Sequence, residues 1–202
     1  MGEPQLREED LDPDPLRQFK AWFDEASSAG ISAPEAMAVA TATAEGAPSV
    51  RMVLMKRCDE RGFVFYTNYE SRKALEVRAN PRAALLFYWA VLGRQVRIEG
   101  PVERTSIEES LAYARSRPRA SQLSALVSPQ SRPIASRAEL ERRAAELESR
   151  YADAELPAHE GWGGLAVTPE SYEFWQHRPD RLHDRLRYER EEVGWRIERL
   201  AP

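Results

Sequence analysis

The sequence has only one cysteine, Cys58, among its 202 residues. A single cysteine excludes an intrachain disulfide and any metal site built from several thiolates. The main interpretation of this thiol is a small buried or half-buried filler, and nucleophilic catalysis is the minor alternative. No apolar run approaches the roughly 18 residues needed to cross a bilayer. The start of the chain also lacks the basic and apolar segments of a signal peptide, so we expect a cytoplasmic protein without a membrane partner.

An excess of positive charge is also absent. The chain carries 29 Lys and Arg against 33 Asp and Glu, with a net charge of −4 and a pI of about 5.6. Domains that coat nucleic acid are strongly basic, so no nucleic-acid partner is expected. Local clusters of cations within an acidic chain indicate a small anionic ligand instead.

The motifs of several enzyme classes are missing. The sequence has no Gly-rich phosphate loop and no pair of carboxylates with evident acid and base roles. His159, His177 and His183 are too scattered to indicate a catalytic triad, and no His or Cys cluster suits a metal ion. We therefore expect no metal. Of the three histidines, only His183 has a strongly basic neighbourhood.

The composition is that of an ordinary folded domain, with 42% hydrophobic and 31% charged residues. A chain of this length buries roughly 70% of its unfolded surface, which is enough for a real core. Residues 1–13 have no periodicity, which predicts a mobile N-terminal arm before a single domain over residues 14–202. Asp14 before Pro15 predicts a helix start, and apolar residues at helical spacing continue this helix to Gly30.

Three further helices are expected. Capping boxes at Ser106 with Glu109 and at Ser136 with Glu139 predict two of them, and a third begins after Ser71. The segment 116–135 is rich in Ser, Arg and Pro, so it is either a plain linker or a binding loop.

Short β-type runs separated by turn residues make up most of the remaining chain. Strands spaced this closely favour an antiparallel barrel or sandwich over units with helical crossovers. The predicted fold is therefore mainly β (α+β), an antiparallel β-barrel with peripheral helices. The expected strands are residues 37–44, 49–56, 63–67, 82–89, 94–102, 164–168 continuing through 172–176, 182–188 and 195–200.

Cations alternate near the C-terminus, where Arg181, His183, Arg185 and Arg187 occupy every second position. On a strand, all four side chains would leave on one face, because successive side chains alternate across the backbone. Guanidiniums beside an imidazole suit a planar, phosphorylated ligand, since Arg offers a fork for phosphate and stacks on flat rings. A solvated outer face explains the alternation equally well.

Two other groups of cations lie earlier in the chain. Arg51 and Lys56 end a buried-looking apolar strand, where a cation is costly unless it is paired or faces an anion. Strand ends that extend into solvent are the alternative. Arg72 and Lys73 fall in the first turn of the helix after Ser71, which the helix dipole disfavours unless an anion is bound there.

Two polar or aromatic positions on strands are ambiguous at this level. Gln95 and Arg97 put polar atoms on one face of strand 94–102, and a solvated face accounts for them. Trp175 lies among β-type residues just before the cationic run, and a Trp in such a place is more often in the core than stacked on a cofactor.

Several longer motifs follow one another along the chain. They are RMVLMK (51–56), FVFYTNYESRK (63–73), RQVRIEG (94–100), SRPRASQ (116–122), SPQS (128–131), EFWQ (173–176), RLHDR (181–185) and the final RLAP. Their order resembles the pyridoxine (pyridoxamine) 5′-phosphate oxidase family from about Asp10 to the last residue. The resemblance implies a Greek-key-like split β-barrel that forms a homodimer with FMN at the subunit interface. It also implies oxidation of pyridoxine or pyridoxamine 5′-phosphate to pyridoxal 5′-phosphate, with dioxygen reduced to hydrogen peroxide.

The same resemblance assigns site residues by motif. Arg181 and His183 would be catalytic residues that hold the pyridine ring, with Arg181 stacked on it. The substrate phosphate would bind Lys56, Tyr113, Arg117 and Ser121. The FMN contacts would be Arg51, Met52, Val53, Leu54, Met55, Lys56, Tyr66, Thr67, Arg72, Lys73, Gln95, Gln130, Ser131, Trp175 and Arg185. Arg187 matches no family position, so its place in the alternation is assigned to a solvated strand end.

The sequence also departs from the family pattern. The N-terminal segment 6–10 is short and acidic where family members often carry a basic and aromatic arm, which affects closure over the substrate. Ser124 and Leu126 stand where a Gly and a Trp are expected, and we expect this to alter packing more than chemistry. Two alternatives remain open: a phenazine-pathway flavoprotein of the same fold, and a protein that binds FMN or pyridoxal phosphate without turnover.

Overall fold

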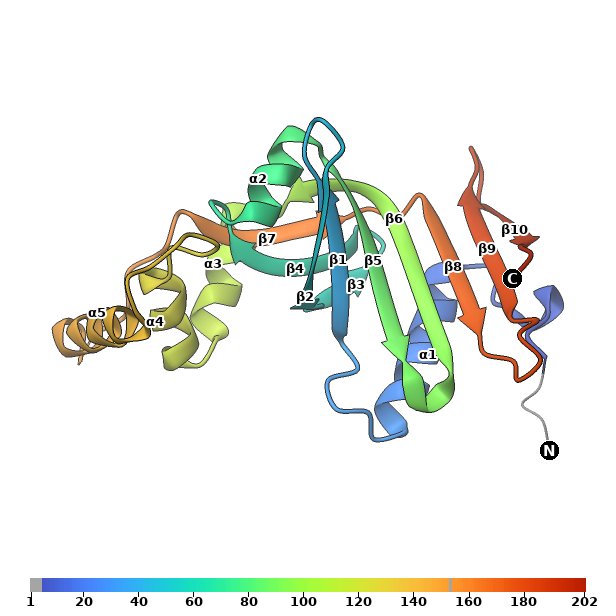
Figure 1. The fold of residues 1–202 in the computed structure, drawn as a ribbon, viewed down its shortest axis with the longest axis horizontal. Coiled ribbons are helices and arrows are strands. Elements are labelled where there is room, and N and C mark those ends of the chain that lie inside the picture. Colours follow the sequence, from blue (N-terminus) through green and yellow to red (C-terminus); the bar gives the residue numbers. More distant parts are fainter. Residues whose placement is uncertain (1–4, 153) are drawn as a thin grey trace.

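A computed structural model of the chain describes residues 5–152 and 154–202 and shows a curved antiparallel sheet with helices around it (Figure 1). The helices are α1 (Pro15–Ser28), α2 (Arg72–Ala79), α3 (Ile107–Ser116), α4 (Arg119–Val127) and α5 (Arg137–Arg150). The strands are β1 (Ala36–Ala42), β2 (Pro48–Leu54), β3 (Arg57–Asp59), β4 (Gly62–Asn68), β5 (Arg82–Trp89), β6 (Arg94–Arg104), β7 (Trp162–Val167), β8 (Ser171–Gln176), β9 (Asp184–Arg190) and β10 (Trp195–Arg199). The predicted mainly β, antiparallel class with peripheral helices is confirmed.

The curvature of the sheet comes from strand β6, which pairs with β5 on one edge and with two different strands, β8 and β7, on the other. The main order is β10-β9-β8-β6-β5-β1-β2, while β4 pairs with β3 and β7, and β7 returns to β6. The first half of β6 pairs with β8 as far as Glu99, and its end pairs with β7 from Val102 onward. Gly100 lies at this change of partner, where a Cβ would approach the Thr168 carbonyl oxygen to 1.9 Å. Only glycine permits so close a passage of two backbones.

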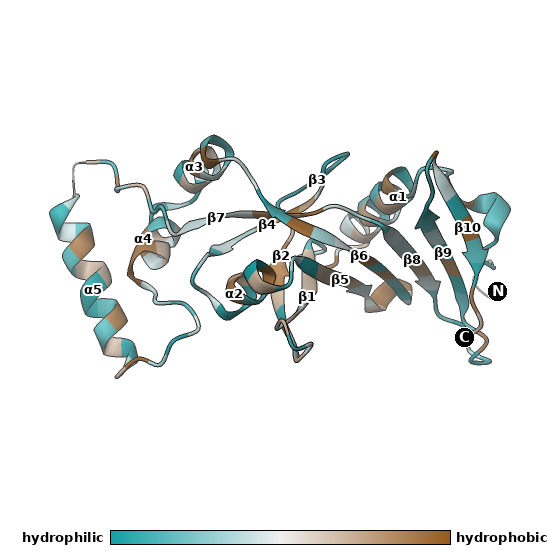
Figure 2. Cartoon of the chain, turned by 90° about the horizontal axis from the view of Figure 1, so that it is seen from above, coloured by the Kyte–Doolittle hydropathy of each residue, from teal (hydrophilic) through white to brown (hydrophobic). Residues whose placement is uncertain are grey.

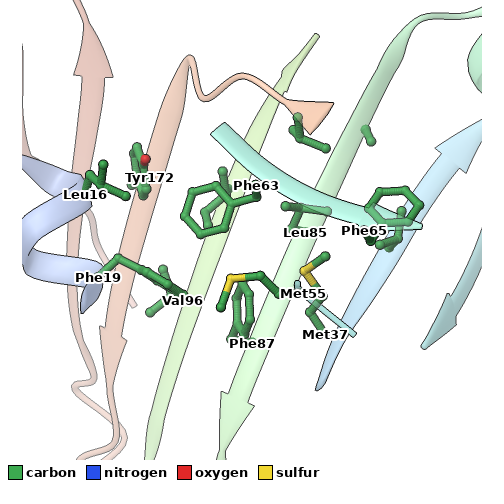
Figure 3. Close-up of a cluster of buried hydrophobic side chains, with 14 of the residues drawn as sticks. Leu16, Phe19, Met37, Met55, Phe63, Phe65, Leu85, Phe87, Val96 and Tyr172 are labelled. Atoms are coloured by element: carbon green, nitrogen blue, oxygen red, sulfur yellow. The ribbon is translucent and has the colours of Figure 1, made fainter. Parts of the chain in front are cut away.

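The core lies between helix α1 and the concave side of the sheet (Figure 3). Asp14 caps α1 by accepting a 2.9 Å hydrogen bond from the Leu16 amide. Phe19 is fully buried, and its ring packs edge-on against Phe63 at 4.8 Å and in a tilted arrangement against Phe87 at 5.0 Å between ring centroids. Replacing a buried Phe by Ala typically costs about 3–5 kcal/mol, so this helix is a main source of stability.

Three of the remaining helices gather at one end of the molecule, while α2 packs against β1. Figure 2 shows α3, α4 and α5 at the end opposite to β8, β9 and β10. An ion-pair network joins α3 to the sheet, because Arg57 of β3 contacts Glu109 of α3 at 2.7 Å. Arg119 in turn joins α4 to α5, since its guanidinium donates to Glu148 at 2.8 Å and to the Ala154 carbonyl at 3.1 Å.

The structure corrects the predicted helix pattern in the segment 116–135. Part of it is α4, neither a linker nor a loop throughout, and the helix was missed because Pro118 at its N-cap offers no side-chain acceptor. The expected helix after Ser71 is confirmed as α2, with Ser71 at its N-cap position. The Ser71 side chain makes no capping bond, and its hydroxyl instead accepts from Lys73 Nζ at 3.4 Å.

Three strand predictions need correction as well. The expected continuous run 164–176 is two strands, β7 and β8, which pair with different parts of β6. The cationic strand begins at Asp184, so Arg181 and His183 lie before it, and Arg181 has a left-handed φ of 69°. The buried-looking strand 51–56 has an exposed face, with Met52 at 64% exposure.

Residues 5–13 of the expected N-terminal arm lie against β9 and β10, while residues 1–4 fall outside the described residues. The Leu6 amide donates to Asp184 at 3.2 Å, and the Tyr188 hydroxyl donates to the Asp12 carbonyl at 2.7 Å. Arg199 of β10 binds both carboxylate oxygens of Glu8 at 2.9 Å. These contacts attach the arm to β9, the strand that follows His183, and to β10.

Candidate cofactor and substrate site

A cavity of about 440 Å³ opens between β2, β4, α2, α3 and α4. All of its lining residues except Pro118 and Trp162 were predicted from the sequence as cofactor or substrate contacts. The folded chain therefore brings together side chains that are far apart in sequence. The predicted residues at this cavity are Arg51, Met52, Val53, Leu54, Lys56, Tyr66, Thr67, Lys73, Tyr113, Arg117, Ser121 and Gln130.

Lys73 is a buried cation at this cavity, only 9% exposed. Its ammonium donates to Thr67 Oγ1 at 3.0 Å and to Gln130 Oε1 at 2.8 Å. Within residues 5–152 and 154–202, no carboxylate forms an ion pair with it. Burial, with a smaller contribution from the nearby Arg51 charge, lowers the pKa of Lys73 to about 8. A buried ammonium with only neutral acceptors is costly, because no opposite charge compensates its desolvation.

Arg51 and Arg72 share one carboxylate, that of Glu76 on α2. Glu76 is 6% exposed and contacts Arg51 at 3.4 Å and Arg72 Nε at 2.8 Å. It also accepts from the hydroxyls of Thr41 and Ser49. Burial alone would raise its pKa, but the hydrogen bonds from Ser49, Thr41 and Arg72 lower the pKa of Glu76 to about 2. The carboxylate therefore stays charged and holds α2 against β1 and β2.

Aromatic rings form one wall of the cavity. Tyr66 of β4 and Tyr113 of α3 stack with 3.9 Å between centroids, and Trp162 lies nearly parallel to both. Burial raises the pKa values of Tyr66 and Tyr113, so both hydroxyls remain protonated donors at neutral pH. Arg117 follows Tyr113 by four residues, and burial lowers its pKa, although an Arg side chain stays charged at neutral pH.

The remaining predicted contacts on this side have different surroundings. Lys56 is exposed at the edge of the cavity, and its amide donates to the Val64 carbonyl at 2.8 Å. Met55 is 7% exposed and packs in the hydrophobic core, so its side chain lies away from the cavity. Ser131 is exposed with a left-handed φ of 69°, directly after Gln130. Arg72 is on α2 beside the cavity but is not among its lining residues.

A second group of predicted residues lies on the other half of the sheet. Gln95 pairs in register with Trp175, and Trp175 pairs with Arg185, so the three form one row across β6, β8 and β9. Their neighbours Val96, Phe174 and Leu186 are fully buried, so this row is on the face opposite the core. Arg185 is braced by Glu173 at 2.8 and 3.0 Å and by the Ala201 carbonyl at 2.9 Å.

His183 lies beside this row, in the turn before β9. Its ring is 4.7 Å from Trp175 and 5.2 Å from His177 between centroids. The Arg178 amide donates to His183 Nδ1 at 3.0 Å, which leaves Nε2 to carry the proton of the neutral ring. Arg181 is exposed two residues earlier.

The two groups of predicted residues do not meet within one chain. Strands β1, β5 and β6 separate β2 from β8 in the sheet (Figure 1). At about 4.8 Å per strand this places them roughly 19 Å apart across the sheet. The chain therefore places cavity residues on one half of the sheet and the residues expected around the pyridine ring on the other half.

An exposed apolar surface lies between these groups on the outer face of the sheet. Val50, Met52 and Leu54 of β2 are 67%, 64% and 41% exposed, and Tyr88 of β5 is 60% exposed. Tyr88 pairs directly with Gln95 in register, so the apolar surface continues into the polar row. A contiguous apolar patch of this kind on a folded domain marks an interaction surface.

Sequence reasoning missed two residues of the site, Trp162 and Glu76. Trp162 had no motif beyond its position before two glycines, and Glu76 was one of many acidic residues on an expected helix. The described residues contain no group of three His, Cys, Asp or Glu side chains arranged for a metal ion. Among the helices of the described segments, none has the length and apolarity to span a bilayer.

Comparison with known proteins assigns the chain to a family. Residues 23–151 match the family model described as pyridoxamine 5′-phosphate oxidase. Residues 162–202 match the model described as the C-terminal dimerisation region of pyridoxine 5′-phosphate oxidase. The chain belongs to the pyridoxamine 5′-phosphate oxidase family. The resemblance seen in the sequence motifs is thereby confirmed.

Individual relatives of this oxidase family agree with the assignment. A pyridoxine/pyridoxamine 5′-phosphate oxidase of Rubrobacter xylanophilus is 60% identical over 98% of this chain and 91% of its own length. The crystal structure of PhzG from Burkholderia lata 383 in complex with tetrahydrophenazine-1-carboxylic acid is similar over 100% of both chains, with a TM-score of 0.92 and 32% identity. A pyridoxamine 5′-phosphate oxidase-related, FMN-binding protein of Nostoc punctiforme has a TM-score of 0.74 at 18% identity, over 95% of this chain and 100% of its own. The predicted split-barrel fold is confirmed.

Proposed function

We propose that this chain is an FMN-dependent oxidase that converts pyridoxine or pyridoxamine 5′-phosphate to pyridoxal 5′-phosphate, with dioxygen reduced to hydrogen peroxide. The observation that carries the proposal is a single cavity with cations at two places. Lys73 and Arg51 lie beside β2 and α2, while Lys56 and Arg117 lie toward α3 and α4. Two separate cationic positions suit two phosphorylated molecules, a cofactor and a substrate. The relative from Rubrobacter xylanophilus carries the name of this activity.

The residues around Lys73 fit the phosphate of FMN. The ammonium is buried among neutral acceptors, so an incoming phosphate would supply the missing counter-charge. The first amides of α2 have no carbonyl partner within the helix, and a helix N-terminus favours an anion. Arg51 and Arg72, both held by Glu76, add positive charge on the same side. Gln130 connects the loop after α4 to this group.

The residues around Arg117 fit the substrate phosphate. Arg117 supplies a guanidinium fork, Tyr113 and Ser121 supply hydroxyl donors, and Lys56 supplies a second charge at the edge of the cavity. Ser121 lies in the first turn of α4, where its amide donates to the Pro118 carbonyl at 2.8 Å. Tyr113 therefore comes from α3, Ser121 from α4, and Arg117 from the junction between these two helices.

A second subunit would complete the site. Arg181, His183 and Arg185 belong to the half of the sheet that does not reach the cavity of its own chain. The exposed apolar surface of Val50 and Met52 lies on the same outer face. Packing two copies through this face would place the polar row of one beside the cavity of the other, with FMN at the interface. The match of residues 162–202 to a dimerisation region supports this homodimer.

The protein's contribution to the reaction would be orientation and electrostatics. Bound FMN supplies a hydride acceptor that dioxygen can reoxidise. Arg181 would stack on the pyridine ring, and His183 would donate a hydrogen bond from Nε2, since its Nδ1 is occupied by the Arg178 amide. Most of the protein's contribution to the rate should come from holding the reacting carbon roughly 3–3.5 Å from the flavin.

A phenazine-pathway oxidase is the second candidate, because the PhzG structure aligns over the whole chain. Its 32% identity is well below the 60% of the Rubrobacter xylanophilus relative. A non-catalytic binding protein is a third candidate, supported only by the short acidic N-terminal segment. Lys56 and Arg117 at the cavity favour the oxidase, because they would bind a substrate phosphate.

One assay separates the three candidates. The purified protein is expected to be yellow and, with pyridoxine 5′-phosphate in air, to form pyridoxal 5′-phosphate and peroxide in equal amounts. A yellow protein that leaves pyridoxine and pyridoxamine 5′-phosphate unchanged would contradict the proposal. Turnover of a reduced phenazine precursor by that same preparation would then favour the second candidate, and inertness toward both the third.

A further inference from the structure

Trp162 is a cavity residue that no sequence motif assigned to the site. It opens strand β7, opposite Asn68 of β4. Its ring lies 5.4 Å from Tyr66 and 6.1 Å from Tyr113 between centroids, with interplanar angles of 16° and 7°. The guanidinium carbon of Arg117 lies over the same indole, 4.6 Å from its centroid. Trp162 therefore touches both a cofactor contact and two substrate contacts of the proposed site.

Arg117 is held in a way that leaves its charge available. It is half-buried, and no described carboxylate lies within 4.0 Å of it, in contrast to Arg51, Arg57 and Arg185. A carboxylate would fix the guanidinium but would also neutralise it and occupy its N–H donors. The face of an indole attracts the cation through the ring quadrupole and leaves the in-plane donors free. An anionic ligand can then bind the edge of the guanidinium while the ring supports its face.

The chain after Trp162 allows the rings to pack closely on the backbone. A Cβ on Gly163 would lie 2.2 Å from the Tyr69 hydroxyl, and one on Gly164 would lie 3.1 Å from Cε1 of Tyr66. Gly164 also pairs in register with Tyr66, and a Cβ there would lie 2.5 Å from Thr105 Oγ1. A side chain at either position would displace its neighbours, so the two glycines let Tyr66 and Tyr69 pack closely on the chain that follows Trp162.

We propose that Trp162 is a positioning residue that presents the Arg117 guanidinium to the substrate phosphate and so sets the preference for phosphorylated over unphosphorylated substrate. The inference rests on the proposed oxidase function. It goes beyond that function because it assigns the preference for a phosphorylated substrate to an uncharged residue. The face of the Trp162 ring has no hydrogen-bond donor for a phosphate.

The test compares Trp162→Leu with Trp162→Phe in the FMN-loaded enzyme. The quantity measured is the ratio of kcat/KM for pyridoxine 5′-phosphate to that for pyridoxine. Loss of the ring face should lower this ratio by roughly 5- to 30-fold in Trp162→Leu, and Trp162→Phe should keep most of it. The fall should come from KM for the phosphorylated substrate. Flavin fluorescence is titrated for every variant, because Tyr66 also contacts Trp162, and all assays use saturating FMN.

Trp195→Leu is the matched control. Trp195 of β10 also lies under an arginine, with 5.4 Å from the Arg190 guanidinium carbon to the ring centroid, and its ring packs edge-on to Tyr172. It is not among the lining residues of the cavity. Trp195→Leu should leave the substrate ratio unchanged, even if it lowers thermal stability as much as Trp162→Leu.

Three outcomes decide the proposal. An unchanged ratio in Trp162→Leu, or an equal fall in the Leu and Phe variants, would overturn it. If Trp162→Leu does not fold, Trp162→Met takes its place, and the cycle of Trp162→Met, Arg117→Lys and their double variant decides, because the ring substitution should add little once the guanidinium is gone. Additive effects there would overturn the inference. The wild-type protein is assayed first with pyridoxine 5′-phosphate. Absence of turnover there would contradict the oxidase function itself.

Discussion

Lys73 Nζ and Gln130 Oε1 are joined by a 2.8 Å hydrogen bond that ties helix α2 to the loop after α4. Because no described carboxylate pairs with Lys73, this ammonium is the strongest candidate for the cofactor phosphate. We predict that Lys73→Met lowers FMN affinity by roughly 30-fold or more, as expected for removing one partner of a buried charge pair. Riboflavin, which lacks the phosphate, should lose much less affinity. Flavin fluorescence titrations of both ligands check this.

Lys20→Met is the control for that substitution. Lys20 is exposed on α1, so its loss changes the net charge of the protein by the same amount without altering the cavity. Its FMN affinity should match that of the wild type. Parallel losses of FMN and riboflavin binding in Lys73→Met would show that Lys73 supports the fold and does not bind the phosphate.

The lowered pKa of Lys73 predicts that FMN binding depends on pH. Burial is the larger cause and the Arg51 charge the smaller one, and together they lower the pKa of Lys73 to about 8. The groups that accept hydrogen bonds from its ammonium, on Thr67, Ser71 and Gln130, are all neutral. The ammonium is present below pH 8 and is lost above it. FMN affinity should therefore fall between about pH 7 and pH 9 in the wild type. Riboflavin affinity should stay flat over this range, and an equal fall for Lys73→Met would contradict the assignment to Lys73.

Arg181→Ala and His183→Ala should reduce oxidation of pyridoxine 5′-phosphate while the protein stays yellow. A loss of about 100-fold in kcat/KM is the size expected for a positioned donor to a reacting ring. Since His183 Nδ1 accepts from the Arg178 amide, the useful proton is on Nε2. His183→Gln can place an amide donor near that position and should retain more activity than His183→Ala. Loss of FMN from both alanine variants would place these residues at the cofactor and not at the substrate.

The division of the site between two halves of the sheet predicts complementation. Arg117→Ala disables the cavity group, and His183→Ala disables the turn before β9. If each site draws these residues from different subunits, random mixed dimers should recover about a quarter of wild-type activity from two inactive parents. Co-expression with two affinity tags gives the mixed population. No recovery would mean that both groups act within one subunit.

Glu76 predicts a stability effect that depends on acid pH. Its carboxylate accepts from Thr41, Ser49 and Arg72, so Glu76→Gln should lower the free energy of unfolding by about 1–3 kcal/mol at pH 7. The pKa of Glu76 is depressed to about 2 in the folded protein, against about 4.5 in the unfolded chain. The ionised carboxylate therefore stabilises the fold fully above about pH 4.5, and this stabilisation is lost as pH falls toward 2. The difference between wild type and variant should therefore shrink over that range. Urea unfolding of flavin-free protein measures it.

Glu141→Gln on the exposed helix α5 is the comparison for Glu76. Its carboxylate pairs with Arg137 one helical turn away and is 61% exposed. Such a surface pair contributes little, so this variant should unfold like the wild type at every pH. A pH-independent loss in Glu76→Gln would indicate disturbed packing and not the loss of a charge.

Elements with strong local signals were predictable from the sequence. Strand β5 has the expected bounds Arg82–Trp89, because a continuous apolar and aromatic run lies between Pro81 and the Leu92-Gly93 turn. Helix α4 was missed because its N-cap is Pro118. The strand expected at 182–188 begins only at Asp184, because the alternation of cations does not report the turn before it, where Arg181 has a left-handed φ. Both errors concern backbone conformations that neighbouring tertiary contacts stabilise.

By itself, the sequence determined the family motifs, the order of the strands along the chain, the cap of α1 and the types of charged group available to a ligand. Only the tertiary structure decided which of these groups meet. Lys73 reaches Gln130 across 57 positions, and Arg117 lies over Trp162, because strand register and helix docking bring distant segments together. Local patterns cannot specify such pairs, since the free energy that selects them comes from packing among residues far apart in the chain.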